Sequence, residues 1–289
     1  MSSLTTIPWD TLARYRLIEI LALWEGRVAA GQIGEAFGIG RQQAQKVLRA
    51  YRQLAPHNLS YDRQRHGYLP SSAFVPLFTQ GRVDEYLRLL NIHDTLDSPF
   101  AGLSMGAANT ESLPMPSRAI TPAVVRELVR ASREKRRLEV NYASFSSPAG
   151  EGRIIVPHTL VFAAGRWHVR AFCEKNREYR DFVLSRFRGV PEDVGPMLGR
   201  HDAENDERWQ TRVAVRLIPD RRLPQAEREL LAMDYGMPDG ELELHCRGPL
   251  ARYALRELGV NPNHAEANPR AQQIEIANRD SLASWILWS

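Results

Sequence analysis

Apolar residues recur at helical spacing in the first part of the chain. Residues 10–27 predict a helix that begins at Asp10 as N-cap and ends at Gly26. A shorter helix is expected in residues 30–39, and "GIG" at 38–40 predicts a tight turn into a third helix over 41–55. The predicted apolar positions are Leu12, Tyr15, Leu17, Ile18, Leu21 and Trp24 in the first helix, Ile33, Ala36 and Phe37 in the second, and Ala44, Val47, Leu48, Tyr51 and Leu54 in the third.

Strand-like patterns follow. Residues 59–70 predict two short strands around a polar turn. After a helix with Thr121 as N-cap and Pro122 at its first position, four strand-like runs occupy the stretch to residue 190. Their short connections predict a small SH3/Sm-like antiparallel β-barrel. The last part alternates strands and helices, which predicts a small α+β module and a multidomain α+β chain.

Two stretches have no clear period and predict linkers. Residues 92–120 are poor in charge and rich in Gly, Ser, Ala and Pro, and residues 191–210 are acidic. The expected domains are therefore a helical domain with a hairpin at 1–91, a bridge at 92–120, a barrel at 121–192 and a C-terminal α+β module at 205–289.

Composition is typical of a folded chain. The chain has 289 residues, of which 43% are hydrophobic and 25% charged, enough for two or three domains. No signal peptide, membrane span or disulfide framework is indicated, so a cytoplasmic protein without membrane association is expected.

The charge is unevenly distributed along the chain. Residues 39–70 contain six Arg or Lys residues and one acid, residues 120–190 fourteen and seven, and residues 191–289 twelve and seventeen. Nearly all the cations are arginines, which suit bidentate contacts to phosphate and guanine, although a biased codon supply explains that preference equally well. The first two regions therefore favour an anionic partner, most simply nucleic acid.

The third helix has the chemistry of a DNA-reading helix. It follows a short helix and a glycine turn, its outer face lacks acids, and a basic hairpin comes next. Arginine can read guanine and glutamine can read adenine in the major groove, while the hairpin would contact phosphates or the minor groove. A charged outer face is otherwise simply solvated. The predicted DNA-binding residues are Arg41, Gln42, Gln43, Gln45, Lys46, Arg49, Arg52, Arg63, Arg65 and His66.

Charged residues also interrupt the barrel strands. Period-two alternation places His168 and Arg170 on one face of their strand, and Arg180 and Arg186 on one face of the next, together with Phe182 and Leu184. These side chains could form an anion-binding surface. Alternatively, the arginines could pair with local acids such as Glu174, Glu178 and Asp181 as structural salt bridges.

The runs "RLEVNYASF", "RIIVPHTLV", "GRWHVRAFC" and "YRDFVLSRF" resemble a WYL domain over roughly residues 122–190. The Y-x-S, R-x-x-x-P-H and R-x-F-x-x-x-R-like elements carry the resemblance, and His168 stands where the family has tyrosine. A winged helix-turn-helix before the barrel and an α+β module after it are similar to the BrxR/CapW-like repressors linked to bacterial phage-defence islands.

The resemblance implies a homodimeric, winged helix-turn-helix repressor that binds an inverted-repeat operator in double-stranded DNA. It also implies that the barrel senses an anionic effector, a nucleotide or a nucleic-acid fragment. The effector residues carried over by motif are Tyr142, Ser144, Arg153, His158, His168, Arg170, Arg180 and Arg186. If His168 titrates near its ordinary pKa, it would strengthen effector binding as the pH falls from about 7.5 to 6.

Other functions have weaker support in the sequence. A nucleic-acid-binding accessory protein that acts on RNA or single strands is the main alternative. The "GLSMG" at 102–106 matches a nucleophile elbow but lacks the flanking strand and helix, so no enzyme is expected. No metal-ligand spacing or P-loop is present, and no cofactor is expected.

Overall fold

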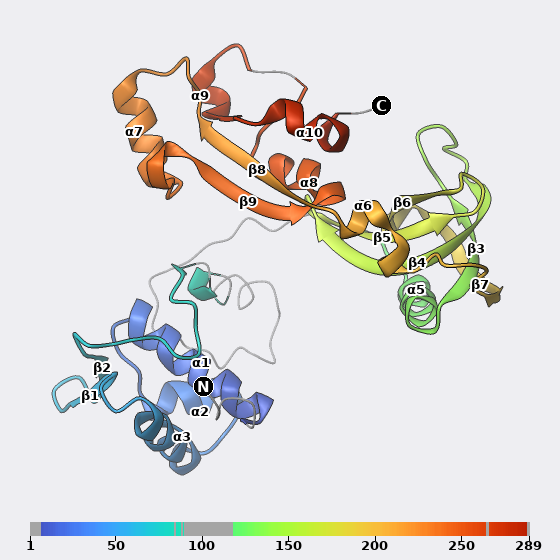
Figure 1. Cartoon of the computed structure of the whole chain (residues 1–289). Helices are drawn as coiled ribbons and strands as arrows, with labels where there is room; N and C mark the ends of the chain where they lie inside the picture. The colour runs from blue at the N-terminus through green and yellow to red at the C-terminus, as the bar shows by residue number, and fades with distance from the viewer. Residues whose placement is uncertain (1–6, 84, 88, 90–117, 264–265, 288–289) are drawn as a thin grey trace. The chain divides into compact units, whose positions relative to one another are not determined.

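The chain divides into two units, Met1–Met115 and Pro116–Ser289 (Figure 1). The computed structural model describes residues 7–83, 85–87, 89, 118–263 and 266–287. The "GLSMG" stretch and most of the expected bridge at 92–120 lie outside the described residues. Within those that are described, no helix is both long and apolar enough to cross a membrane.

The first unit begins with three helices and a hairpin, as the sequence predicts. Gly38 has a positive φ of 60° and ends the second helix, and Gly40 is the N-cap of the third, so the tight turn is confirmed. The first helix begins at Trp9 with Pro8 as its N-cap, so the prediction of Asp10 as N-cap is wrong, and Asp10 lies in the first turn of the helix. The bounds are α1 (Trp9–Trp24), α2 (Ala30–Phe37), α3 (Arg41–Leu54), β1 (Leu59–Asp62) and β2 (Gly67–Pro70).

The core of this unit lies between α1 and α3. Ile18 and Leu21 of α1 and Leu48 of α3 are almost completely buried. The apolar stripe is narrower than predicted, because Leu12, Trp24 and Leu54 are 39%, 37% and 49% exposed. Leu54 is the last residue of α3, and its side chain lies beyond the packed face.

Glu19, in the middle of α1, is a fully buried carboxylate that the sequence analysis missed. It accepts hydrogen bonds from the Tyr51 hydroxyl at 2.9 Å and from the backbone N–H groups of Leu77, Phe78 and Thr79 at 2.8, 2.8 and 2.9 Å. Asn58 donates to Tyr51 and to the Val75 carbonyl. A buried carboxylate is tolerated when hydrogen bonds replace its hydration, and these bonds anchor the segment after the hairpin onto α1 and α3.

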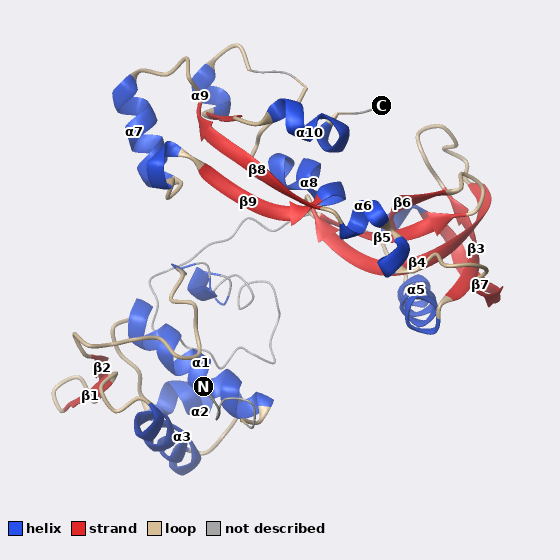
Figure 2. Cartoon of the chain, viewed as in Figure 1, coloured by secondary structure: helices blue, strands red, loops and turns tan. Residues whose placement is uncertain are grey.

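The second unit begins with a helix beneath a five-stranded antiparallel sheet. Thr121 is the N-cap and Pro122 the first helical residue, as predicted. The sheet order is β6-β5-β4-β3-β7, and the helix packs beside β3, β4 and β7 (Figure 2). The bounds are α5 (Pro122–Glu134), β3 (Arg136–Tyr142), β4 (Glu151–Ala163), β5 (Arg166–Cys173), β6 (Glu178–Val183) and β7 (Phe187–Pro196).

The expected closed barrel is not found. In the described part of the chain, no strand pairing joins β6 to β7, so these strands are the two ends of the sheet. The run over 179–190 is also not one strand, because a 3₁₀ turn at Leu184–Arg186 separates β6 from β7. The prediction that Arg180 and Arg186 share a strand face is therefore wrong.

The C-terminal part is the predicted α+β module. Its three-stranded sheet has the order β10-β8-β9, and its core includes Val215, Leu217, Leu255 and Ile286. Part of the expected second linker is structured, since β7 extends to Pro196 and a short helix follows. The bounds are α6 (Glu207–Gln210), β8 (Arg212–Pro219), α7 (Gln225–Asp234), β9 (Leu242–Arg247), α8 (Ala251–Glu257), α9 (Pro269–Gln272), β10 (Ile274–Ile276) and α10 (Arg279–Ile286).

Replacing Glu19 by glutamine should destabilise the first unit by about 2 to 3 kcal/mol, because the amide loses the charge and one of the acceptors that these donors require. Urea unfolding and amide hydrogen exchange of the full chain measure this, and exchange of residues 77–79 should accelerate most. Glu35→Gln, the same change at an exposed position of α2, is the control and should leave both unchanged. Equal effects of the two substitutions would contradict the role given to Glu19.

Candidate nucleic-acid interface and effector site

The outer face of α3 is exposed along its length. The buried side of this helix consists of Ala44, Val47, Leu48 and Tyr51, which turns the remaining positions to solvent. All ten residues predicted to bind DNA are exposed, namely Arg41, Gln42, Gln43, Gln45, Lys46, Arg49, Arg52, Arg63, Arg65 and His66. None of the ten forms an ion pair with an acid in the described residues, so the face keeps its positive charge.

The β1–β2 hairpin is attached to the helices by backbone bonds. Val28 and Tyr68 exchange two N–H···O bonds of 2.8 Å, which adds a short bridge beside β2. The guanidinium carbon of Arg52 lies 5.0 Å from the centre of the Tyr68 ring, so the end of α3 also contacts the hairpin. A Cβ on Gly67 would come within 3.1 Å of the Val28 carbonyl oxygen and closer to the Arg27 side chain, so glycine permits this approach. The hairpin tip is thus held at a fixed position relative to α3.

The eight predicted effector residues do not form one cluster. In the β5–β6 ladder, Arg170 is opposite Asp181, whereas Arg180 is opposite Ala171. Directly opposed residues point to the same face and successive residues to opposite faces, so Arg170 and Arg180 lie on different faces of the sheet. Arg180 is exposed and pairs with its neighbour Glu178.

Four of the predicted residues lie around the C-terminal end of β3. The Tyr142 hydroxyl accepts the Val183 N–H at 2.9 Å, and the Arg153 guanidinium carbon lies 5.8 Å from the Tyr142 ring centre. Arg153 pairs with Glu151 at 2.6 Å, and its Nε is buried without a partner. Ser144 begins the following turn, where the Ala143 N–H bonds to the carbonyl of Arg186.

Arg186 has a different environment from the other predicted arginines. Its guanidinium carbon lies 4.8 Å from the centre of the Phe145 ring, and the Phe145 side chain is 91% exposed. In the described residues Arg186 has no ion pair with an acid. It is therefore a cation held near the surface without a counter-charge.

Arg170, on the other face of the sheet from Arg180, forms a buried ionic junction with Asp206. Arg170 is 4% exposed and Asp206 1% exposed. The Arg170 Nε and Nη2 donate to the two Asp206 oxygens at 2.6 and 3.2 Å, and its Nη1 donates to Asp181 at 3.0 Å. Asp206 also accepts the Trp209 N–H at 3.0 Å as the N-cap of α6. Arg170 thus pairs with acids inside the fold, which is the alternative to an anion-binding role that the sequence left open.

His158 belongs to the same junction. Its Nε2 lies 3.4 Å from the Asp206 carboxylate, and its Nδ1 contacts the Thr159 hydroxyl at 2.8 Å. Burial raises the pKa of Asp206, but hydrogen bonds from His158, Arg170 and the Trp209 N–H outweigh burial and lower it to about 2. Asp206 is therefore an anion at neutral pH, which holds the C-terminal segment against β5.

Asp206 was not predicted as a site residue. A signal for it exists, because an aspartate three residues before Trp209 is the pattern of a helix N-cap. The pattern does not reveal its partner Arg170, since the two residues are 36 positions apart.

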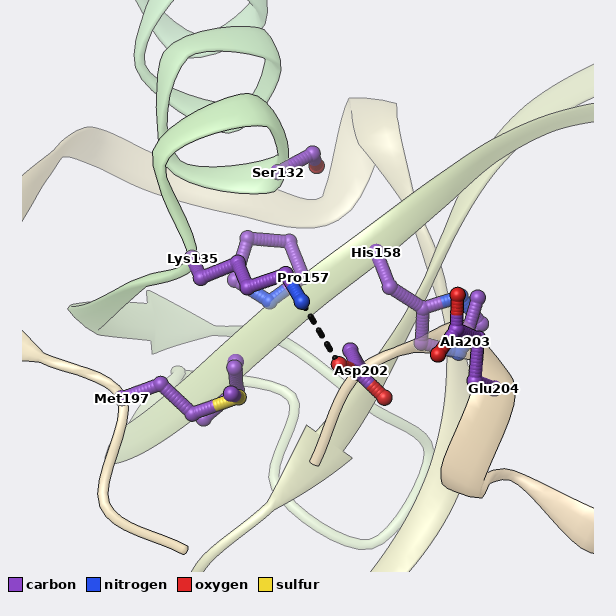
Figure 3. Close-up of a pocket in the computed structure, with 9 residues that line it drawn as sticks. Ser132, Lys135, Pro157, His158, Met197, Asp202, Ala203 and Glu204 are labelled. Atoms are coloured by element: carbon purple, nitrogen blue, oxygen red, sulfur yellow. Dashed lines mark hydrogen bonds and ion pairs between the residues drawn. The ribbon is translucent and has the colours of Figure 1, made fainter. Parts of the chain in front are cut away.

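A small pocket lies beside this junction, between the end of α5, the middle of β4 and residues 197–204 (Figure 3). Its volume is about 170 Å³, which is small compared with the roughly 300 to 1,000 Å³ of typical ligand pockets. The Lys135 ammonium and the Asp202 carboxylate are 2.8 Å apart in the pocket. It is lined by Ser132, Lys135, Val156, Pro157, His158, Met197, Asp202, Ala203 and Glu204. The pocket is too small for a nucleotide.

Three family models match the chain in the order expected. They are the BrxR transcriptional regulator winged helix-turn-helix domain at residues 10–92, the WYL domain at 123–191, and the BrxR transcriptional regulator C-terminal dimerization domain at 212–282. The DNA-binding transcriptional repressor CapW of Escherichia coli (strain KTE188) is 34% identical over 275 residues, 95% of this chain and 91% of that protein. The chain belongs to the BrxR/CapW family.

Two further CapW repressors have similar coverage. That of Pseudomonas aeruginosa is 32% identical, over 96% of this chain and 92% of its own. That of Stenotrophomonas maltophilia is 31% identical, over 99% and 95%. The solved structure of Proteasome accessory factor B/C (PafBC) of Arthrobacter aurescens covers 98% of this chain and 50% of its own, with 16% identity and a TM-score of 0.26. The BrxR/CapW relatives are named as repressors and not as enzymes.

The family tyrosine is replaced here by a buried histidine. His168 is 3% exposed, and its ring centre lies 5.1 Å from that of Tyr253. Burial lowers the pKa of His168, and Asp181, which acts in the opposite direction, does not restore it. The ordinary pKa on which the expected pH response depends is therefore not found, and His168 carries less positive charge near neutral pH than an ordinary histidine.

The lowered pKa of His168 predicts a loss of stability in acid. The unfolded chain binds a proton near the ordinary histidine pKa of about 6.5, whereas the folded chain resists protonation, so stability falls as the pH decreases below about 6.5. Thermal unfolding of the full chain between pH 7.5 and 5 measures this. His168→Tyr should flatten the decrease, whereas His245→Gln, at an exposed histidine, should not. Parallel pH profiles for wild type and His168→Tyr would contradict the assignment.

Proposed function

We propose that this chain is a sequence-specific DNA-binding transcriptional repressor whose α3 reads the major groove of an inverted-repeat operator. The observation that carries the proposal is the acid-free, exposed face of α3 with the basic hairpin fixed beside it. Arginine and glutamine on such a face can form paired hydrogen bonds to guanine and adenine. CapW relatives named as DNA-binding transcriptional repressors, at 31–34% identity, support the same function. The resemblance to repressors of phage-defence islands extends the proposal to an operon of that kind.

The hairpin would contribute affinity more than sequence preference. Arg63, Arg65 and His66 are exposed at its tip, where cations can contact phosphates on either side of the groove. Phosphate contacts release counter-ions, so they make binding strongly dependent on salt. The helix and the hairpin thus have separable roles.

The effector proposal is that the second unit binds an anion and changes operator affinity. Arg186 supports it, because its guanidinium lies over the Phe145 ring and it has no ion pair in the described residues. Arg153, Arg170 and Arg180 each pair with an acid, so they bind a ligand only if those pairs open. Of the predicted arginines, Arg186 is therefore the one that we propose binds the effector.

A nucleic-acid-binding accessory protein that acts on RNA or single strands is the alternative function. A DNase footprint on the DNA upstream of the protein's own gene separates the two. A repressor should protect an inverted repeat there at concentrations that leave random duplex DNA unprotected. Protection of no specific site, together with tighter binding to single strands, would favour the accessory protein.

Substitutions on α3 and on the hairpin should have different effects. Arg41→Ala or Gln45→Ala should weaken operator binding by about 1 to 3 kcal/mol and relax the preference at one base step. Arg63→Ala or Arg65→Ala should weaken operator and random DNA to a similar degree and reduce the salt dependence. Fluorescence anisotropy with both DNAs over a range of salt measures this. Equal losses on operator and random DNA for Arg41→Ala would assign that residue to phosphate contact.

We also propose that the chain is a homodimer that pairs through its C-terminal module, which the dimerization-domain model matches. The apolar C-terminal end, residues 285–288, is expected from the sequence to be buried in the fold or in the dimer. Ile286 is buried in the module core with Trp285 packed against it, Leu287 is 41% exposed, and Trp288 lies outside the described residues. Helix α7 instead carries exposed Leu230 and Met233, at 59% and 75%. They are three residues apart and therefore share a helix face, which suits contact with a second copy.

Light scattering of the full chain should give twice the mass of one chain. Leu230→Asp combined with Met233→Asp should give monomers, because each carboxylate would lose its hydration in an apolar contact. Val190→Asp, at a similarly exposed apolar residue of β7, should remain dimeric. A monomeric wild type would exclude the dimer, and a dimeric double variant would place the contact away from α7.

A further inference from the structure

Arg52 is at the C-terminal end of the exposed face of α3. Residues 41, 45, 49 and 52 are three or four positions apart, so they share one side of the helix. The rise of an α-helix places Arg52 about 16 Å from Arg41 along the axis. The major groove is about 12 Å wide, and a recognition helix contacts base edges with its N-terminal residues. With Arg41 in the groove, Arg52 therefore lies beyond the bases that the helix reads.

The Arg52 guanidinium lies over the ring of Tyr68, in β2. Its carbon is 5.0 Å from the ring centre, within the roughly 6 Å at which a cation is attracted to an aromatic face. Within the part of the chain that the structure describes, Arg41 and Arg49 have neither an ion pair nor a ring contact. Arg52 thus differs from the other arginines of α3 in contacting the hairpin.

Tyr68 extends this contact across the hairpin. It is opposite Tyr61 in the β1–β2 ladder, and opposed residues share a face of the strand pair. The two rings meet edge to face with their centres 5.2 Å apart. Leu59, two residues before Tyr61, is on the same face and is buried in the core of the first unit. Arg52, Tyr68 and Tyr61 therefore form a row on the side of the hairpin that faces the helices.

The tip of the hairpin follows the orientation of its base. The Asp62 carboxylate accepts the Arg65 N–H at 2.8 Å, which orders the turn between the strands. At the base, Tyr68 and Val28 exchange backbone hydrogen bonds, which join the hairpin to the segment between α1 and α2. The ring contact with Arg52 joins the hairpin to α3 itself. The position of Tyr68 therefore determines how far the tip cations lie from the reading helix.

We propose that Arg52 is a positioning residue, which acts through Tyr68 to hold the hairpin at the distance from α3 that the operator requires, and does not itself contact DNA. This rests on the proposed repressor function and deepens it, because it assigns a predicted DNA-binding residue to support of the hairpin. The N-terminal half of α3 then reads bases. Arg63 and Arg65 contact phosphates whose distance from those bases is set by the contact between Arg52 and Tyr68.

A double-mutant cycle on DNA binding separates this role from a direct contact. The probe is a duplex that carries the inverted repeat protected in the footprint. Arg52→Ala should weaken binding of the full chain about twofold to fivefold, the loss expected for an exposed contact between a cation and a ring. Tyr68→Leu, which keeps an apolar side chain without the ring, should weaken binding to a similar degree. Combining the two substitutions should add nothing further.

Arg49→Ala is the matched control, since Arg49 is exposed on the same face of α3 and has no ring contact in the described residues. It should weaken binding by the same factor in the wild type and in Tyr68→Leu. A loss from Arg52→Ala that persists in Tyr68→Leu would assign Arg52 to a DNA contact and overturn the proposal.

Amide hydrogen exchange of the free protein tests the contact without DNA. Arg52→Ala should accelerate exchange of the Tyr68 and Val28 amides about twofold to fivefold, because the hairpin separates from the helices more readily. Arg49→Ala should leave both amides unchanged. Exchange of the Leu48 amide, in the buried part of α3, should stay at its wild-type rate and shows that the helices remain folded.

The exchange result also keeps this proposal distinguishable from the repressor function. A wild type that protects no specific site would remove the repressor function. Faster exchange at Tyr68 in Arg52→Ala would still support the role of Arg52 in holding the hairpin, and unchanged exchange there would overturn it.

Discussion

The buried ion pair between Arg170 and Asp206 fixes the arrangement of the second unit. Arg170 of β5 is buried, so water cannot solvate its guanidinium and it requires hydrogen-bond acceptors within the protein. Asp206 supplies them, and the same carboxylate caps α6 and contacts His158. Removing one partner of such a pair costs about 3 to 5 kcal/mol, because the other charge stays buried. The WYL region and the C-terminal module are therefore held together by a polar contact as well as by the packing of Trp209 and Tyr253.

The arginines of the second unit fall into two groups, according to whether they pair with an acid as Arg170 does. Those paired with acids, such as Arg136 with Asp193 and Arg137 with Glu174, hold segments of the sheet together. Arg186 and Arg166 have no such partner in the described residues and retain their full charge. In the first unit, the cations of α3 and its hairpin likewise have no acidic partner among the residues that the structure describes. The basic regions of the sequence thus contain two kinds of cation: those that pair with acids and stabilise the fold, and those whose charge is not paired and can attract an anion.

The sequence predicted best what depends on local patterns. The helix-turn-helix follows from helical spacing, from the positive φ of Gly38 and from the extended conformation of Gly40, all of which are properties of a short segment. The alternation of strands and helices in the C-terminal module was predicted for the same reason. These predictions are confirmed.

The features that the sequence did not predict depend on distant partners. Nothing near Leu184 indicates that a 3₁₀ turn breaks the strand, because the turn is set by pairing of β6 with β5 and of β7 with β3. The sharing of Glu19 by Tyr51 and three backbone N–H groups, some 60 residues further along the chain, is likewise invisible to periodicity. The eight effector residues were grouped by motif, whereas strand register separates Arg170 from Arg180.

Amide hydrogen exchange of the full chain carrying Asp206→Asn tests most directly whether the Arg170–Asp206 pair joins the two modules. We expect faster exchange both in residues 203–209 and in the 168–172 segment of β5, because the charge left on Arg170 opens the junction from both sides. Asp202→Asn, which breaks the more exposed pair with Lys135, should leave β5 unchanged. Faster exchange confined to residues 203–209, or none in either segment, would contradict the coupling.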